Sequence, residues 1–534
     1  MVRGDRDGTG RPQGWSFQED WDSVMSTKYR KLAAAMALAG AIGLIAGCGG
    51  SSSSSRDGTL SVVAIVPQAG AASVANDSEV HATFSRAIDA AVLSGDSLVI
   101  ECPTGSPMGG TVSYDPANFM LSFTPAERFP SEETCTATIS AALADLRGRT
   151  LGETFTWQFG TALDVAFIEQ GREIFRFDTF GNEAQWTDSL RMHEVISAAV
   201  DPVTALSVGL KVDVEALPPA LQEGILDGSI DLESPDTTVA LLKLDAVVGV
   251  KGTVEDFSGE DTLTRVGITC ALCHSTVDDS FAPGIGRRLD GWANRDLDPG
   301  AIIALSPALT DAQKAVYSSW GKGMYDPRFN LDGINGPHVI SPAYGLKGIH
   351  SITSTGDGED IAYWNRYVAV TQMGGLGSFS EPRTGVMVIN GTEDLVSDKL
   401  PALQAYQHSL PAPPPPPGSF DPPAAARGKV VFEGVAQCVS CHTGPELTDA
   451  NERLHSPTEV VSEPEPGGAP SYASRSATKM YRTAPLRGIW QHPPYFHNGI
   501  AATLEDVVEL YDSRRALGLT EADKLDLVEY LKSL

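Results

Sequence analysis

The chain has 534 residues, with 39 Lys and Arg against 68 Asp and Glu, and a formal net charge of −29. This acidity disfavours nucleic-acid binding, because affinity for a phosphate backbone depends on clustered Lys and Arg that release counterions. A hydrophobic fraction of 42% excludes wholesale disorder. The length suits about two to four domains.

Residues 1–47 form an expected export signal. A basic stretch at 28–31 precedes the apolar run 32–46, in the order of a secretory signal peptide. Because residues 1–24 are polar and show no periodicity, Met25 is an alternative start. The run Ile45-Ala46-Gly47-Cys48 resembles the lipobox of bacterial lipoproteins, which implies that Cys48 carries a lipid. A plain signal peptide followed by a chance cysteine is the alternative.

Residues 48–58 then form a Gly and Ser tether, whose composition cannot bury a core. The residue after Cys48 is Gly49, not the aspartate that usually retains lipoproteins at the inner membrane. We therefore expect a cell-envelope lipoprotein of the outer membrane, facing the periplasm or the outside. The lipid would be its contact with the membrane.

Residues 59–161 contain short, β-branched runs separated by turn residues, which predicts an all-β antiparallel sandwich. The expected strands are 60–66, 80–84, 97–100, 111–114, 119–123, 134–139 and 154–159. Motifs such as Trp157-Gln158-Phe159-Gly160-Thr161 resemble the bacterial Ig-like repeat of cell-envelope proteins, which implies spacing or adhesion. Cys102 and Cys135 fall on strands, and an oxidising compartment favours a disulfide over two buried thiols.

Four further cysteines stand in two C-x-x-C-H motifs, Cys270-Ala271-Leu272-Cys273-His274 and Cys438-Val439-Ser440-Cys441-His442. On a helical turn the two sulfurs share one face, where they can form thioethers with haem vinyl groups, and the histidine lies beneath the iron. A four-cysteine zinc site and thioredoxin-like pairs are alternatives, but neither requires a histidine directly after each pair. The motifs predict two haem c groups, with His274 and His442 as the proximal iron ligands.

A weak internal repeat surrounds the motifs. Residues 171–175 match 428–432, and 345–349 match 485–489. This predicts two mostly α-helical cytochrome c-like haem domains after the Ig-like sandwich. Their expected bounds are 162–410, which includes an insertion at about 176–265, and 426–534. The Pro-rich segment 411–425 is expected to link them as a stiff spacer.

The run from Pro485 to Gly499, followed by Thr503 to Tyr511, closely resembles the end of bacterial dihaem cytochrome c peroxidases. Relatives of those enzymes include the dihaem enzyme of the methylamine pathway and the rubber oxygenases. Residues 171–194 and the motif Trp364-Asn365-Arg366-Tyr367 look most like the rubber-oxygenase branch. The resemblance covers roughly 165–534 and implies a haem oxidoreductase that exchanges electrons with a redox partner, such as a small cytochrome.

The distal ligands decide between catalysis and electron transfer, because only an open sixth position binds O2 or peroxide. Tyr511 stands where the peroxidases place the distal methionine of the second haem, which implies ligation by a phenolate. A packed core aromatic is the alternative reading. Met480 and His492 are further candidates, whereas His497 is expected to line the pocket.

The first haem lacks the distal histidine of the peroxidases, since no histidine occurs between Ser275 and Pro337. An exchangeable position is therefore expected there, with Met373 as the first choice of protein ligand. The remaining candidates are Met324, His338, His350 and Met387. Each of these side chains has ordinary packing as its alternative role.

The resemblance also implies accessory residues. Trp364 and Trp490 are candidates for an aromatic bridge between the haems, although large tryptophans usually serve the core. Thr483 and Pro485 match a segment that binds calcium in the peroxidases. Two function classes stay open at this stage, a dihaem oxidoreductase that uses peroxide or O2 and a pure electron-transfer cytochrome of an envelope respiratory chain. A rubber-oxygenase-like dioxygenase is a variant of the first class.

Overall fold

The structure is a computed structural model that describes residues 60–534. The expected signal segment 1–47, the lipidated Cys48 and the tether 48–58 lie outside the described residues. Between residues 60 and 534, every helix is too short or too polar to span a bilayer.

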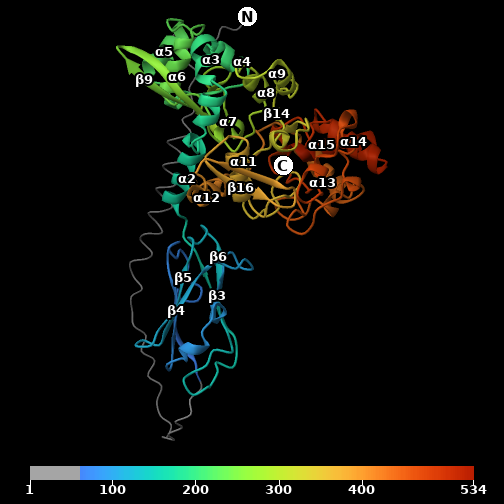
Figure 1. Cartoon of the computed structure of the whole chain (residues 1–534). Coiled ribbons are helices and arrows are strands. Elements are labelled where there is room, and N and C mark those ends of the chain that lie inside the picture. Colours follow the sequence, from blue (N-terminus) through green and yellow to red (C-terminus); the bar gives the residue numbers. More distant parts are fainter. Residues whose placement is uncertain (1–59) are drawn as a thin grey trace, which may run out of the picture. The chain divides into compact units, whose positions relative to one another are not determined.

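The first described domain is a sandwich of two antiparallel sheets, drawn in blue and cyan in Figure 1. The four-stranded sheet has the order β1-β2-β5-β4, and the three-stranded sheet has the order β3-β6-β7. The strands are β1 Val62–Val66, β2 Val80–Phe84, β3 Leu98–Glu101, β4 Gly110–Asp115, β5 Met120–Pro125, β6 Thr134–Ile139 and β7 Phe155–Gly160. Two short 3-10 turns, η1 Ala90–Val92 and η2 Gly95–Ser97, precede β3. All seven strands expected from the alternating sequence are present.

Alternation of side chains along each strand fills the space between the two sheets. Leu98, Ile100, Leu121 and Ile139 are fully buried there. The Trp157 side chain is also buried, and its indole N–H donates to the carbonyl of Pro67 at 3.0 Å, so its polar atom is satisfied.

Cys102 and Cys135 form a disulfide. Cys135 lies on β6 and Cys102 directly follows β3, and these strands pair with each other in the three-stranded sheet. The bond therefore ties the end of one strand to its hydrogen-bonded neighbour and closes a loop with a sequence separation of 33.

Replacing Cys102 and Cys135 together by Ala is expected to destabilise this domain by about 3–4 kcal/mol, because the unfolded chain regains the entropy of an open loop. Chemical denaturation of the excised domain, residues 60–161, measures the difference. An equal denaturation midpoint in the presence and absence of reductant would contradict the expectation.

A body of helices and small sheets follows, drawn from green to orange in Figure 1. Its longer helices are α2 Val165–Phe177, α3 Met192–Ala199, α4 Pro202–Ser207, α5 Pro219–Asp227, α6 Pro235–Lys243, α8 Pro299–Ala304, α9 Asp311–Ser318, α11 Ile361–Thr371 and α12 Leu400–Ser409. Its short helical turns are η3 Ala184–Ser189, η4 Val214–Ala216, α7 Ala271–His274, α10 Phe329–Asp332 and η5 Ser397–Lys399.

The same body contains five two-stranded sheets, so it is less purely helical than expected. The strand pairs are β8 Val212–Asp213 with β12 Ile285–Gly286, β9 Val250–Phe257 with β10 Glu260–Ile268, β11 Ser275–Val277 with β13 Arg288–Asp290, β14 Met324–Tyr325 with β15 His338–Val339, and β16 Gly377–Glu381 with β17 Val386–Asn390.

The expected insertion at 176–265 folds as helices followed by the long β9–β10 hairpin. Ser258 and Gly259 turn this hairpin, both with positive φ, as a two-residue loop requires. Because β10 ends at Ile268, the hairpin delivers the chain directly to the first C-x-x-C-H motif.

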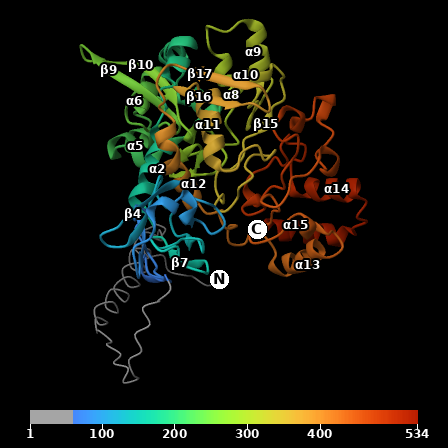
Figure 2. The same cartoon turned by 60° about the horizontal axis from the view of Figure 1, so that its bottom comes forward.

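The last part of the chain is a second helical unit, red in Figure 2, in which α13, α14 and α15 lie together. Its elements are α13 Pro422–Glu433, η6 Cys438–Ser440, η7 Pro457–Glu459, η8 Pro466–Gly468, η9 Tyr472–Arg475, η10 Ile489–Gln491, α14 Leu504–Arg515 and α15 Glu521–Lys532. The unit begins before the expected boundary at 426, because Asp421 caps α13 and Pro422 is tolerated in its first turn.

The same close contact between two helices, made at a glycine, occurs in both helical bodies. A Cβ added to Gly171 of α2 would lie 1.9 Å from the carbonyl oxygen of Ala402 on α12, and a Cβ on Gly428 of α13 would lie 1.9 Å from that of Asp526 on α15. One turn later, Phe175 meets Tyr406 edge-on with ring centroids 5.5 Å apart. Phe432 meets Tyr530 in the same way at 5.1 Å. The sequence repeat therefore corresponds to a repeated helix crossing.

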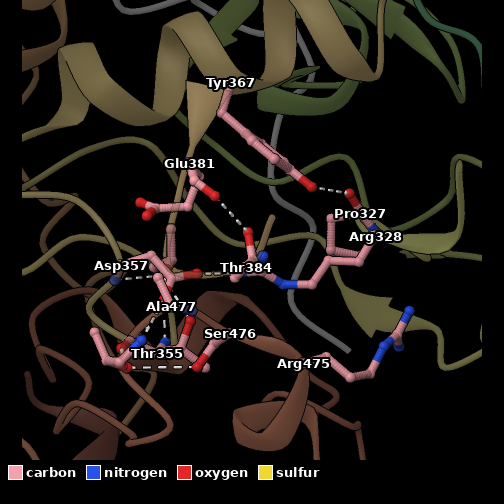
Figure 3. Close-up of polar contacts among 12 residues, drawn as sticks. Pro327, Arg328, Thr355, Asp357, Tyr367, Glu381, Thr384, Arg475, Ser476 and Ala477 are labelled. Carbon is pink, nitrogen blue, oxygen red and sulfur yellow. Dashed lines mark hydrogen bonds and ion pairs between the residues drawn. The ribbon is translucent and has the colours of Figure 1, made fainter. Parts of the chain in front are cut away.

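Buried ion pairs join the two bodies. Arg475 of the second body donates to Asp326 of the first at 3.0 Å, and the two side chains are 3% and 0% exposed. Within the first body, Asp357 pairs with Arg328. The same carboxylate accepts the backbone N–H of Ala477, of the second body, at 3.0 Å (Figure 3). Since a buried charge stripped of its partner costs several kcal/mol, these contacts hold the two bodies together.

Candidate functional site

Each C-x-x-C-H motif forms one turn of helix. The backbone N–H of His274 donates to the carbonyl of Cys270 at 3.2 Å, and that of His442 donates to Cys438 at 2.9 Å. This hydrogen bond from residue i to residue i−4 closes one helical turn, so the two cysteines and the histidine of each motif lie close together. Within residues 60–534, no cluster with metal-ligand spacing contains four cysteines, which counts against the zinc alternative.

Both motif histidines are oriented in the same way. His274 Nδ1 lies 2.9 Å from the carbonyl oxygen of Ser341, and His442 Nδ1 lies 2.9 Å from that of Leu447. A carbonyl accepts only, so Nδ1 carries the proton and Nε2 keeps its lone pair. Burial lowers the pKa of both histidines, to about 4 for His274, so both imidazoles are neutral at pH 7. A neutral imidazole with a fixed tautomer is the form that ligates iron.

The second motif faces a cavity of about 500 Å³. Cys438, Cys441 and His442 lie on its wall, and α14 and α15 contribute apolar side chains to it. A volume in this range is typical of cofactor pockets. Donor chemistry, tautomer and space therefore fit a covalently bound haem c at this motif.

Tyr511 on α14 lines the same cavity as His442. Its ring packs against Phe496 at 6.0 Å between centroids, and burial raises the pKa of its hydroxyl to about 12. In the described part of the chain this hydroxyl has no hydrogen-bond partner. The side chain is half-buried and lies on the cavity wall, so the geometry is compatible with the ligand role expected from the sequence.

The other residues named for the second haem lie in different settings. His492 lines the cavity, whereas Met480 is not among the residues of its wall. His497 also lines it, but its Nε2 lies 2.6 Å from Glu465 Oε1 and 3.3 Å from the Tyr481 hydroxyl. His497 is therefore held in a polar network at the cavity wall, as expected.

The residues named for the first haem are dispersed. Met373 is 4% exposed and lies in the hydrophobic core against which Cys270 packs. His338 has both ring nitrogens engaged, one with the Val339 carbonyl and one with the Ser354 hydroxyl, which leaves none for iron. Met387 is 71% exposed, and His350 is exposed as well. Met324 is half-buried on β14. Of these candidates, Met373 lies in the same hydrophobic core as Cys270 of the first motif.

Trp490 contacts a residue that sequence reasoning did not single out. Its ring meets Trp292 edge-on at 5.8 Å, and its indole N–H donates to the Pro413 carbonyl at 3.2 Å. Trp292 follows Gly291, whose N–H donates to the carbonyl of His274. The aromatic pair therefore extends from the first motif to the second unit. Trp364 instead stacks on Tyr367 at 4.6 Å, inside the core of the first body.

Thr483 and Pro485, the expected calcium segment, lie on the cavity wall. The Thr483 carbonyl accepts the Thr448 hydroxyl at 2.6 Å, and its own hydroxyl contacts His455 at 3.0 Å. Calcium at this segment stays a prediction.

Two arginines of the cavity wall were also missed. Arg295 and Arg482 have side-chain N–H groups that are buried without a hydrogen-bond partner. The sequence offers no motif for them, because Arg295 belongs to the first body and reaches this cavity only in the folded chain.

Two family profiles match parts of the chain. Residues 57–161 match the bacterial Ig-like domain, and residues 480–517 match the family described as RoxA-like, cytochrome c-like. The second match includes Tyr511 and much of the cavity wall.

Curated relatives are cytochrome c peroxidases. Cytochrome-c peroxidase IdrP1 of Denitromonas iodatirespirans is 29% identical over 149 residues, which cover 21% of this chain and 40% of that protein. IdrP2 of Pseudomonas sp. (strain SCT) is 32% identical over 146 residues, covering 21% and 39%. The matched region thus spans about two fifths of the length of these relatives.

Among solved structures, a MauG-like protein associated with microbial copper homeostasis aligns with 37% of this chain and 73% of its own length, at 20% identity and a TM-score of 0.26. By the two family profiles and the curated relatives, the chain combines a bacterial Ig-like domain with a RoxA-like, cytochrome c-like C-terminal segment, and it is related to cytochrome c peroxidases.

Proposed function

We propose that this chain is an exported dihaem c-type cytochrome oxidoreductase. The observation that carries the proposal is the matched geometry of the two motifs. In each, the histidine donates a hydrogen bond from Nδ1–H to a backbone carbonyl at 2.9 Å, and the lone pair of Nε2 stays free. Haem supplies one-electron chemistry and, at an open iron, the binding of peroxide or O2. The chain's residues orient the proximal imidazoles and exclude water from them.

The two sites have different proposed roles. Tyr511, whose hydroxyl has no hydrogen-bond partner in the described chain, would ligate a haem at the second motif, and a haem with two protein ligands would relay electrons. Of the two histidines expected as candidates for the first haem, His338 has both ring nitrogens engaged and His350 is exposed. Peroxide or O2 chemistry is accordingly assigned to the first haem, with Met373 as its alternative sixth ligand.

Two other functions are distinguished by ligation. In a pure electron-transfer cytochrome of an envelope respiratory chain both irons are six-coordinate, and neither binds CO or cyanide. A rubber-oxygenase-like dioxygenase is favoured by the RoxA-like match at 480–517. One high-spin ferric haem in the EPR spectrum supports catalysis, whereas two low-spin haems support electron transfer.

The cellular setting belongs to the same proposal. Cys48 carries the lipid, the protein is attached to the outer membrane, and the Ig-like domain separates that anchor from the redox body. A small cytochrome or another electron donor or acceptor is the redox partner. Calcium at Thr483 and Pro485 completes the proposed cofactor set.

Replacing Cys438 and Cys441 by Ala is expected to lower the haem content from two to one per chain, because no thioether forms at the second motif. The equivalent change at Cys270 and Cys273 has the same result. The pyridine haemochrome assay on purified protein measures the ratio. A wild-type ratio of one, or haem extracted by acid and acetone, contradicts the dihaem proposal.

Tyr511→Phe is expected to change the spin state of one haem and to shift its ferric/ferrous equilibrium toward ferrous by about tenfold, because a negative ligand charge is lost. EPR and a redox titration measure both effects. Tyr530→Phe is the matched control, since Tyr530 packs on Phe432 in the same unit. If both variants are spectroscopically silent, Tyr511 is a packing residue.

Trp490→Phe is expected to slow electron equilibration between the haems, because Trp490 and Trp292 form the aromatic contact between the units. Flash photolysis of the CO-bound, half-reduced protein follows the rate. Trp364→Phe is the control, as Trp364 stacks within the first body. Equal rates in the two variants would argue against the Trp292–Trp490 contact as the electron path.

A further inference from the structure

The cavity at the second motif is lined by cationic side chains, although the chain as a whole is strongly acidic. Four arginines and one glutamate are its charged residues other than histidine and cysteine: Arg295, Arg482, Arg487, Arg515 and Glu459. The chain carries a net charge of −29, so this excess of positive charge is local. It indicates an anionic occupant.

Two of these arginines differ from the other two in exposure. Arg487 and Arg515 are exposed, and each donates to a backbone carbonyl, of Pro445 and Glu459 respectively. Arg295 and Arg482 are less exposed, and side-chain N–H groups of both are buried without a partner. Among the wall residues that the structure describes, the buried N–H groups without a partner belong to these two arginines.

The three most deeply buried arginines of residues 60–534 are each paired with an aspartate. Arg288 pairs with Asp213, Arg328 with Asp357 and Arg475 with Asp326. Arg295 and Arg482 form no ion pair within residues 60–534. An uncompensated buried charge is costly, so a partner outside the polypeptide is expected.

The surroundings of Arg295 support this reading. The groups that interact electrostatically with it are the phenols of Tyr344 and Tyr495 and the imidazoles of His338 and His492. None of them is a carboxylate. Arg482 uses one nitrogen to donate to the Ser351 carbonyl at 2.9 Å, and its Nε is left without a partner.

We propose that Arg295 and Arg482 bind the two propionate carboxylates of the haem anchored at Cys438 and Cys441. The proposal rests on the proposed function, because it requires that this haem be present. A planar guanidinium suits a carboxylate through paired N–H donors, and two cations match the two propionates of one haem. Both arginines would be cofactor-binding residues, and their role would be to hold the carboxylates of the haem.

The assignment has a structural consequence. Arg482 belongs to the second unit, whereas Arg295 belongs to the first body, between β13 and α8. The carboxylates of one haem then join the two bodies, in addition to the ion pair between Arg475 and Asp326. The first body thereby tunes the haem of the second, because a cation near the porphyrin stabilises the ferrous state.

The test is an EPR-monitored redox titration of the full-length protein carrying Arg295→Gln or Arg482→Gln. Each variant is expected to retain two covalent haems by pyridine haemochrome. The ferric/ferrous equilibrium of one haem should shift toward ferric by about tenfold, the effect of removing one nearby unit charge in a medium of intermediate dielectric. The other haem should keep its potential.

Three controls separate charge from folding. Arg295→Lys and Arg482→Lys keep the positive charge and should restore most of the shift. Arg427→Gln removes an exposed arginine that pairs with Asp526 away from the cavity, and it should leave both potentials unchanged. If the shift in potential instead came from a structural defect, the Lys variants would show it as well as the Gln variants.

A free anion is the other source of negative charge for this wall. Inorganic phosphate, added to the wild type at constant ionic strength, should leave both potentials unchanged if propionates already occupy the arginines. A potential that responds to phosphate in the wild type but not in Arg295→Gln overturns the proposal. Unchanged potentials in both Gln variants overturn it as well. A wild-type haem content below two per chain instead contradicts the proposed function itself.

Discussion

Two helices can bring their backbones into contact only where a side chain is missing, and this constraint is met twice in the chain. Gly171 admits the carbonyl of Ala402, and Gly428 admits that of Asp526. A larger residue at either glycine would collide with the backbone of the facing helix and push the two helices apart. Phe175 and Phe432 follow one turn later and pack against Tyr406 and Tyr530, so the first helix of each body is fixed against its last helix.

The repeat extends to a tight turn in each body. Gly348 and Gly488 adopt positive φ of 78° and 73°, and the following isoleucines, Ile349 and Ile489, donate to the carbonyls of Leu346 and Leu486. The leucine and isoleucine side chains of both turns are buried. In the second unit, this turn places Ile489 and Leu486 on the cavity wall. A crossing and a turn thus recur in both bodies, although long insertions separate them in the first.

The sequence was informative where the determinants are local. The strands of the Ig-like domain, the motif turns and the glycine and phenylalanine of each crossing follow from spacings of a few residues. The β9–β10 hairpin was missed, although Ser258 and Gly259 are a typical turn pair. Trp292 and Arg295 were not predictable, because their partners lie in the second unit, nearly two hundred residues away along the chain.

The segment 291–295 links the two sites physically. Gly291 and Asn294 donate backbone N–H groups to the carbonyls of His274 and Cys273, at 2.8 and 2.9 Å, so the segment is fastened to the first motif. Gly291 has a φ of 83°, which favours glycine, and an added Cβ would make tight contacts of 3.1 Å with Tyr344 and Leu410. Trp292, which lies between these two residues, packs against Trp490. Arg295, which directly follows Asn294, lines the second cavity. One short segment therefore carries the contacts to the first motif, the aromatic contact to the second unit and a cation of the second cavity.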